Sequence, residues 1–291
     1  MAKKKSILDF QIMKSEGKQV TWLTAYDYPT AQFEEQAGID MILVGDSLGN
    51  CVYGYATGTI PVTMEQCIVH TEAVRRGAPN TFIVGDMPFL SYQTTPEEAV
   101  KNAGRFYKEA GVDAIKLEGG RRIINMISAI VNAGMVVCGH IGLTPQSTGQ
   151  FGGYKAQGST AESAMEVIKD ARAVQQAGAA LLLIEAVTPE VGKVITEELK
   201  IPVYGIGAGP YCDGQLLIVS DVLGIWEAFK PKFVKRYAHL ADESVKALSE
   251  YIREVREKKF PTEEHFYKMK PGESEKLFEL LKEAEKNSTR K

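Results

Sequence analysis

The residues of this chain best suited to chemistry are four carboxylates, each of which ends a short apolar run. They are Asp46 after MILVG, Asp86 after TFIVG, Glu118 after AIKL and Glu185 after LLLI. Continuous apolar runs are typical of buried parallel strands, and α/β enzymes place catalytic groups at the C-terminal ends of such strands. One acid in this position could be a helix cap or a turn residue. Four of them, at the ends of separate strands, are predicted to meet at one end of the sheet, where their oxygens would form a site for a hard cation. We call this end of the sheet the mouth.

Asp46, Asp86 and Glu118 are the expected metal ligands. All three present oxygen donors, and the chain has no His or Cys grouping at zinc spacing. Mg2+ and similar hard cations prefer oxygen donors and keep water or substrate oxygens in their remaining positions. We therefore expect a divalent cation and a small anionic substrate that carries oxygen ligands of its own.

Lys116 is the cation expected beside these acids. It lies two residues before Glu118, so both side chains face the same side of a strand. A buried lysine without a partner is costly, and its expected partners are the acidic cluster and the anionic substrate. The alternative is that a pair between Lys116 and a carboxylate simply fills the interior.

Glu185 and His140 are the remaining candidates. Glu185 lies between LLLI and AVTP, and this apolar setting favours a role in proton transfer. It could instead cap the next helix, although Thr188 is the more natural cap. His140 ends another apolar run and is either a hydrogen-bonded core residue or a substrate contact. A cation, a lysine and a glutamate base together predict enolate chemistry.

A repeated pattern of helix, Ala-Gly and apolar strand predicts the elements that position these residues. Its glycines, Gly38, Gly111, Gly134 and Gly178, stand where a helix end needs a left-handed residue. Eight strands are expected, at 20–27, 41–46, 81–87, 114–120, 135–143, 181–187, 201–209 and 232–237. Amphipathic helices between most of them, one of which begins at Thr95, predict a (β/α)8 TIM barrel rather than an open doubly wound sheet.

Two segments and a tail lie outside this alternation. Residues 47–63 and 144–158 are rich in Gly, Thr and Tyr and follow the second and fifth expected strands. They are predicted to be lid or substrate loops, with ordinary surface loops as the alternative. From about residue 240 the chain is rich in Lys and Glu, with a break at 261–264, which predicts extra C-terminal helices. The expected organisation is a catalytic barrel at 1–260 and a helical extension at 261–291, part of the same domain or of a subunit interface.

Bulk composition excludes several classes of protein. The 291 residues carry a net charge of −3 with both signs interspersed, so no nucleic-acid partner is expected. The opening MAKKKSILDF has only a two-residue apolar pair, so we expect that it is not a secretory signal. No run approaches the length of a membrane span. The four cysteines form no CxxC pair, which is typical of a reduced, cytoplasmic protein.

Eight strings of this sequence closely resemble the ketopantoate hydroxymethyltransferase (3-methyl-2-oxobutanoate hydroxymethyltransferase) family. They are TAYDYPTA at 24–31, VGDSLGN at 44–50, GYATGTIPVT at 54–63, VGDMPFLSY at 84–92, KLEGG at 116–120, GHIGLTPQS at 139–147, IEAV at 184–187 and GIGAGP at 205–210. The resemblance runs from about residue 5 to about residue 260. It implies a barrel of the phosphoenolpyruvate/pyruvate type and a homo-oligomer built from dimers, commonly a decamer.

The resemblance also implies roles for the residues that match. Asp46, Asp86 and Glu118 would hold or surround Mg2+, the oxo acid would contact Asp46, Ser47, Asp86 and Lys116, and Glu185 would be the proton acceptor. The implied reaction joins 3-methyl-2-oxobutanoate and 5,10-methylenetetrahydrofolate to give 2-dehydropantoate and tetrahydrofolate, the first committed step of pantothenate biosynthesis. A sister enzyme acting on another oxo acid, or a non-catalytic barrel, are the alternatives.

Overall fold

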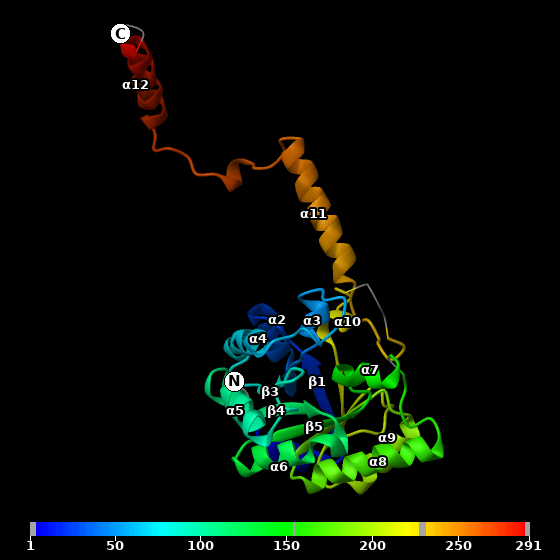
Figure 1. The fold of residues 1–291 in the computed structure, drawn as a ribbon. Helices are drawn as coiled ribbons and strands as arrows, with labels where there is room; N and C mark the ends of the chain where they lie inside the picture. Colours follow the sequence, from blue (N-terminus) through cyan, green and yellow to red (C-terminus); the bar gives the residue numbers. More distant parts are fainter. Residues whose placement is uncertain (1–3, 154, 227–230, 289–291) are drawn as a thin grey trace. The chain divides into compact units, whose positions relative to one another are not determined.

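Eight parallel strands close into a barrel in chain order, with β1 hydrogen-bonded to both β2 and β8 (Figure 1). The computed structural model describes residues 4–153, 155–226 and 231–288. The strands are β1 (Val20–Thr24), β2 (Met41–Val44), β3 (Phe82–Asp86), β4 (Ala114–Glu118), β5 (Val137–Gly142), β6 (Leu181–Glu185), β7 (Val203–Ile206) and β8 (Gly214–Leu217). The predicted (β/α)8 fold is confirmed.

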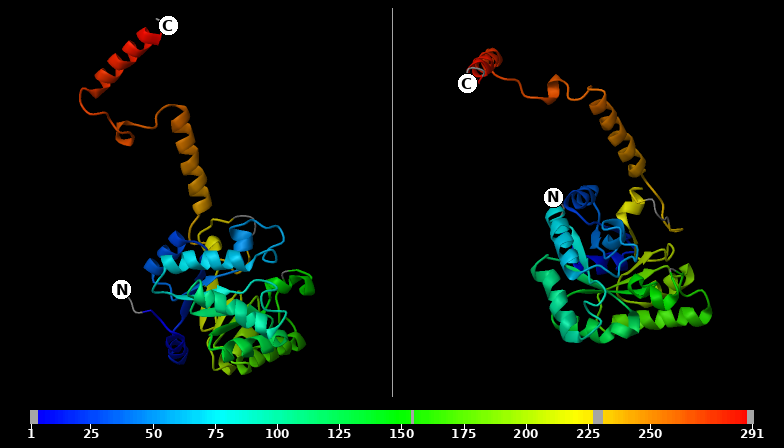
Figure 2. Two further views of the ribbon diagram at one scale, coloured as in Figure 1. Left: turned by 60° about the vertical axis from the view of Figure 1, so that its left-hand side comes forward. Right: turned by 45° about the horizontal axis from the view of Figure 1, so that its top comes forward.

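The helices lie on the outside of the strands (Figure 2). The longer ones between consecutive strands are α2 (Tyr28–Ala37), α4 (Met64–Gly77), α5 (Pro96–Lys108), α6 (Ile124–Asn132), α8 (Ala161–Gln176) and α9 (Pro189–Glu198). Thr95 caps α5 by accepting a hydrogen bond from the Glu98 backbone N–H, as the sequence predicts. The glycines of the four Ala-Gly pairs have φ between 64° and 98°, so each turns the chain out of a helix towards the next strand.

The inward-facing residues of the barrel change from apolar to polar along each strand. On β3 the inward row reads Phe82, Val84, Asp86, and on β6 it reads Leu181, Leu183, Glu185. Helix α1 (Ile7–Ser15) precedes the first strand and packs Phe10 among the apolar inward residues, edge-on to the Phe82 ring at 5.1 Å. Apolar layers therefore fill the interior towards the start of the strands, and polar side chains gather at their C-terminal ends.

The predicted strand at 232–237 is wrong. Those residues form turns and irregular structure, and the eighth strand is β8. Only seven residues, 207–213, join β7 to β8, which is too short for the crossover helix that the repeating pattern requires. A Cβ on Gly214 would lie 2.3 Å from the Val20 carbonyl oxygen, so glycine is needed where β8 meets β1. The strand itself reads GQLL and begins with a glycine and a glutamine, so it differs from the continuous apolar runs of β2 and β6.

The segments after β2 and β5 contain more helix than the sequence predicts. The first includes α3 (Leu48–Cys51), and the second includes a 3-10 turn, η2 (Pro145–Ser147), followed by α7 (Thr148–Phe151). A short α10 (Val219–Val222) follows β8. All of these segments leave the C-terminal ends of strands, where residues of a substrate site are expected.

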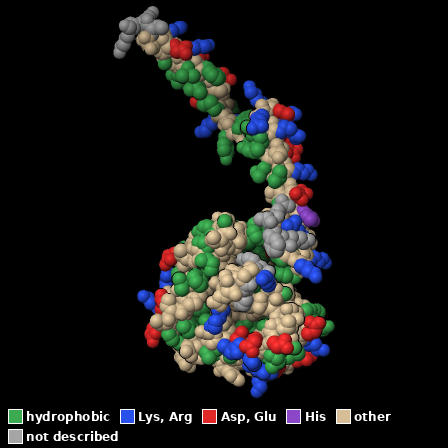
Figure 3. Space-filling model, turned by 45° about the vertical axis from the view of Figure 1, so that its right-hand side comes forward, with side chains coloured by type: hydrophobic (Ala, Val, Ile, Leu, Met, Phe, Trp, Pro, Cys, Tyr) green, Lys and Arg blue, Asp and Glu red, His purple; other side chains and the backbone are tan. Residues whose placement is uncertain are grey.

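Residues from Leu240 onward form a second compact unit. It contains α11 (Leu240–Arg256), η3 (Glu263–His265) and α12 (Glu273–Ser288), so the helices and the break expected near residue 261 are confirmed. The barrel unit ends at His239, and the division expected at residue 260 stays a prediction. Neither long helix has a buried residue, and apolar side chains lie on the surface of this unit (Figure 3). None of the described helices combines the length and apolar character that crossing a membrane requires.

Candidate active site

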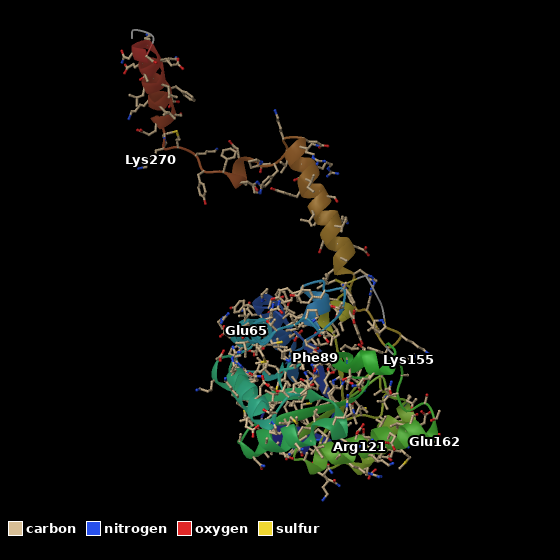
Figure 4. All side chains as sticks on the ribbon, in the orientation of Figure 1. Glu65, Phe89, Arg121, Lys155, Glu162 and Lys270 are labelled. Atoms are coloured by element: carbon tan, nitrogen blue, oxygen red, sulfur yellow. The ribbon has the colours of Figure 1, made fainter. Side chains whose placement is uncertain are left out.

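The four carboxylates and His140 lie at the C-terminal ends of five neighbouring strands, β2 to β6. Glu118 is level with His140 in the sheet, and Glu185 is level with Gly142. Asp46 follows β2 and Asp86 ends β3. The inward side chains of this half of the barrel therefore meet at one mouth, as the sequence predicts. Figure 4 shows how densely side chains fill the barrel unit, and it labels Phe89 on the loop that follows β3.

Lys116 neutralises part of the acidic cluster. Its Nζ lies 2.6 Å from Asp86 Oδ1 and 3.0 Å from Glu118 Oε1, and all three side chains are at most 3% exposed. Burial alone would lower the pKa of Lys116, but Asp86, Glu118 and Asp46 outweigh it and raise that pKa well above its ordinary value. The lysine is therefore a buried ammonium held by two carboxylates. This pairing fits both the functional and the space-filling interpretation of Lys116.

The cluster still carries more negative charge than its surroundings balance. Burial, followed by repulsion from Asp86, raises the pKa of Asp46 well above its ordinary value. Burial also raises the pKa of Asp86, although Lys116 opposes it. Burial acts in the same direction on Glu118, but Lys116 and His140 outweigh it and lower the pKa of Glu118 to about 2. An additional cation beside Asp46 and Asp86 would relieve the remaining repulsion.

The residues present fit a hard cation that takes few ligands from the protein. Asp46 Oδ1 has no hydrogen bond within the described part of the chain, whereas the second Asp46 oxygen accepts one from Gln146. Within residues 4–153, 155–226 and 231–288, no three His, Cys, Asp or Glu side chains form a ready metal cage. Mg2+ commonly binds through one or two carboxylates and takes water and substrate oxygens as its other ligands.

His140 links the acidic cluster to Glu185. Its Nδ1 lies 3.2 Å from Glu118 Oε1 and its Nε2 lies 3.2 Å from Glu185 Oε2, although neither contact has the geometry of a hydrogen bond. Burial lowers the pKa of His140, but Glu118 and Glu185 outweigh it and raise the pKa to about 9. The Glu185 side chain is 16% exposed, against 1% for His140. Glu185 is thus the acid of this group that reaches the open mouth, and a substrate contact by His140 stays a prediction.

Ser47 follows Asp46 in the chain and is the residue immediately before α3. Its Oγ is 2.7 Å from the hydroxyl of Tyr26, and the serine is half-buried. One of the two hydroxyls donates in this contact, so the Ser47 oxygen keeps at least one free hydrogen-bonding position. Where the Tyr26 hydroxyl is the donor, the Ser47 O–H is free to donate to an acceptor oxygen of a ligand.

Two residues of the site, Gln146 and Tyr92, were missed by sequence reasoning. Both are almost fully buried, and Gln146 hydrogen-bonds both Asp46 and Glu118. The Tyr92 hydroxyl lies 2.7 Å from Gln146 Oε1 and accepts a hydrogen bond from the Glu118 backbone N–H at 3.0 Å. Neither residue is charged or ends an apolar run, so strand patterning does not identify them. Both lie inside strings that carry the family resemblance, which was the available signal.

Sequence relatives of this chain share one name. A protein of Alkaliphilus metalliredigens named 3-methyl-2-oxobutanoate hydroxymethyltransferase is 60% identical over 284 residues, which cover 97% of this chain and all of the relative. A protein of Geobacillus kaustophilus with the same name is 51% identical over 269 residues, which cover 92% of this chain and 96% of the relative.

Solved structures with the same fold are far more distant in sequence. A phosphonopyruvate hydrolase in complex with oxalate and Mg2+ matches 98% of both chains with a TM-score of 0.58 and 15% identity. A 2,3-dimethylmalate lyase of the PEP mutase/isocitrate lyase superfamily matches all of both chains with a TM-score of 0.57 and 15% identity. These similarities show the type of barrel only. The model of the ketopantoate hydroxymethyltransferase family matches residues 4–263, and this chain is a member of that family.

Proposed function

We propose that this chain transfers a hydroxymethyl group to 3-methyl-2-oxobutanoate. The one-carbon unit comes from 5,10-methylenetetrahydrofolate, and with one water the products are 2-dehydropantoate and tetrahydrofolate. This is a reaction of pantothenate biosynthesis, and family membership supports it. The observation that carries the proposal is the position of Glu185, a carboxylate at the open mouth beside a buried cluster of three acids and one lysine.

Mg2+ is the proposed metal, with Asp46 and Asp86 as ligands and Glu118 beside them. Their oxygen donors and the raised pKa values of the two aspartates fit a hard cation. When bound, Mg2+ would stabilise the negative charge that develops on the keto oxygen of the substrate.

The proposed roles of the other residues follow from their positions. Lys116 would offset the charge of the incoming oxo acid, and Ser47 would hydrogen-bond one of its oxygens. Glu185 would take the proton from the carbon next to the keto group. His140, with its pKa raised to about 9, would hold the Glu185 carboxylate in place by charge. The resulting enolate carbon would then attack the one-carbon unit of the folate.

A direct assay tests the reaction. The purified protein is incubated with 3-methyl-2-oxobutanoate, Mg2+ and 5,10-methylenetetrahydrofolate, and 2-dehydropantoate is measured by mass spectrometry. Omission of each component in turn is the control. Product that requires all three supports the proposal, and no product with all three present contradicts it. Turnover of phosphonopyruvate or 2,3-dimethylmalate in the same buffer would favour a sister enzyme instead.

We further infer that the chain forms a homo-oligomer, with a pentamer of dimers as the expected arrangement. Outward-facing Thr21 of β1 and Gln215 of β8 are exposed, whereas the outward residues of β2 to β4 are buried. In the second unit, Leu248 and Tyr251 of α11 are more than half exposed. Contacts between copies would bury such surfaces. Light scattering at several protein concentrations tests this, and a single monomeric species would contradict it.

A cytoplasmic location stays a prediction from the sequence.

A further inference from the structure

We propose that Gln146 is a positioning residue that sets the orientation of Asp46 and Glu118 for the cation and the oxo acid. This inference rests on the proposed function and adds to it a residue that acts through the two carboxylates. The proposal is carried by a set of buried hydrogen bonds in which two acceptors, Asp46 Oδ2 and the Met87 carbonyl oxygen, fix the orientation of the Gln146 amide.

The side-chain amide of Gln146 has one orientation that satisfies all its neighbours. Its oxygen faces Gln93 Nε2 at 3.1 Å and the Tyr92 hydroxyl at 2.7 Å. The same hydroxyl also has the Glu118 carbonyl oxygen within reach as an acceptor, at 3.0 Å. Its Nε2 faces two acceptors, Asp46 Oδ2 and the Met87 carbonyl oxygen, both at 2.9 Å. A flipped amide would place oxygen against oxygen at both acceptors. Gln146 therefore presents an N–H to Asp46.

Each buried carboxylate of the cluster has one oxygen fixed in this way by a neutral N–H group. Asp46 Oδ2 accepts from the Gln146 side chain, and Glu118 Oε2 accepts from the Gln146 backbone at 3.1 Å. Asp86 Oδ2 accepts from the backbone of Asp46 at 2.9 Å. The other oxygens of Asp86 and Glu118 point to Lys116. Gln146 thus supplies two of the three fixed contacts, which leaves Asp46 Oδ1 for a cation.

Loss of the Gln146 amide should act on metal binding first. Asp46 would lose the contact that fixes its carboxylate plane, while its charge would remain. Outer contacts that orient metal ligands typically change metal affinity or activity roughly 10- to 100-fold when they are removed. Because Glu118 is held by the Gln146 backbone, a side-chain substitution leaves that contact in place.

The test uses Mn2+ as a probe for Mg2+ and measures its affinity by titration calorimetry on the full chain. Gln146→Met keeps the length of the side chain and removes its hydrogen bonds, and Gln146→Asn keeps the amide but withdraws it by one methylene. We expect both variants to bind Mn2+ roughly 10- to 100-fold more weakly than the wild type. Deuterium exchange of 3-methyl-2-oxobutanoate should then need more Mg2+ for half-maximal rate and approach the wild-type rate at saturating Mg2+.

Gln175→Met is the matched control for a purely structural effect. The Gln175 amide oxygen also accepts two backbone N–H groups, of Lys200 and Ile201, but near the start of β7, at the opposite end of the strands. This variant should lose thermal stability and bind Mn2+ as the wild type does. Gln146 variants that fold and bind Mn2+ with unchanged affinity would overturn the inference while leaving the proposed reaction intact. Wild-type protein that binds no Mn2+ would overturn both.

Tyr92→Phe tests the direction of the network. Removal of the hydroxyl takes away one of the two groups that hold the Gln146 oxygen, so Mn2+ binding should weaken, although less than in Gln146→Met. In the double variant Tyr92→Phe/Gln146→Met, the two losses should add only in part, because Tyr92 acts on Asp46 through the amide and on Glu118 through hydrogen bonds to its backbone. Fully additive losses in Mn2+ affinity would show that the two residues act independently and would contradict the proposed chain.

Discussion

Glu34 gives the barrel a pH-dependent stability that one substitution should remove. It lies on α2, is 5% exposed, and neither carboxylate oxygen has a hydrogen bond among the described residues. Burial, with a smaller contribution from Asp27, raises the pKa of Glu34 from 4.5 to about 9. The folded state therefore favours the protonated carboxyl. The stability is fully present below the pKa of the unfolded chain, 4.5, and is lost progressively as the pH rises towards 9.

The size of the effect follows from the separation of the two pKa values. One pKa unit corresponds to about 1.4 kcal/mol, so ionisation of Glu34 in the unfolded chain lowers the stability of the folded protein by roughly 3 kcal/mol at pH 7 and by up to roughly 6 kcal/mol above pH 9. Glu34→Gln has nearly the same shape and cannot ionise. Relative to the wild type, its free energy of unfolding should be similar at pH 4.5 and about 3 kcal/mol higher at pH 7.

Urea unfolding followed by circular dichroism, at several pH values and one fixed protein concentration, measures this difference. The control is Glu35→Gln on the same helix, because Glu35 accepts hydrogen bonds from Asn80 and Thr81 and should lose stability on substitution. Parallel stability curves for the wild type and Glu34→Gln between pH 4.5 and 8.5 would refute the reasoning. They would mean that the Glu34 carboxyl is hydrated or paired in the folded protein.

Three further predictions concern the site. EDTA should abolish turnover and added Mg2+ should restore it, and full activity in metal-free buffer would mean that the carboxylates have another role. Asp86→Ala should lose the dependence of oxo-acid binding on Mg2+, measured by calorimetry with and without the metal. Lys116→Ala should raise the KM for 3-methyl-2-oxobutanoate and lower stability by roughly 3–5 kcal/mol, because Asp86 and Glu118 lose their buried partner. Unchanged KM and kcat would favour a space-filling Lys116.

The strand ends could be predicted because two independent patterns agree there. Apolar runs identify β2 to β6. The period-two alternation of a strand places Lys116 and Glu118 on one face, and in the structure Lys116 Nζ lies 3.0 Å from Glu118 Oε1. Ala-Gly pairs locate the helix ends, because the left-handed backbone that glycine adopts there is a local property of the sequence. The site roles of Asp46, Ser47, Asp86, Lys116, Glu118, His140 and Glu185 remain predictions that the experiments above address.

The missed features depend on contacts that local patterns do not contain. β8 is held by a close backbone approach of Gly214 to Val20, across nearly two hundred residues of chain. Gln146 is held by hydrogen bonds to Asp46 and Met87, which lie in the loops that follow β2 and β3. A neutral amide within a loop gives no sequence signal of such contacts. They become visible only after the barrel has closed.

The most direct test of the account follows proton removal by Glu185 without folate. Exchange of the hydrogen beside the keto group of 3-methyl-2-oxobutanoate is measured by NMR in deuterated water with Mg2+. Glu185→Gln keeps the shape of the side chain but cannot accept a proton, so exchange and turnover should fall together by roughly 10²- to 10⁴-fold. Mn2+ and oxo-acid affinity should persist, since the acidic cluster is intact. Exchange by the variant at the wild-type rate would contradict the assignment of Glu185 as the base.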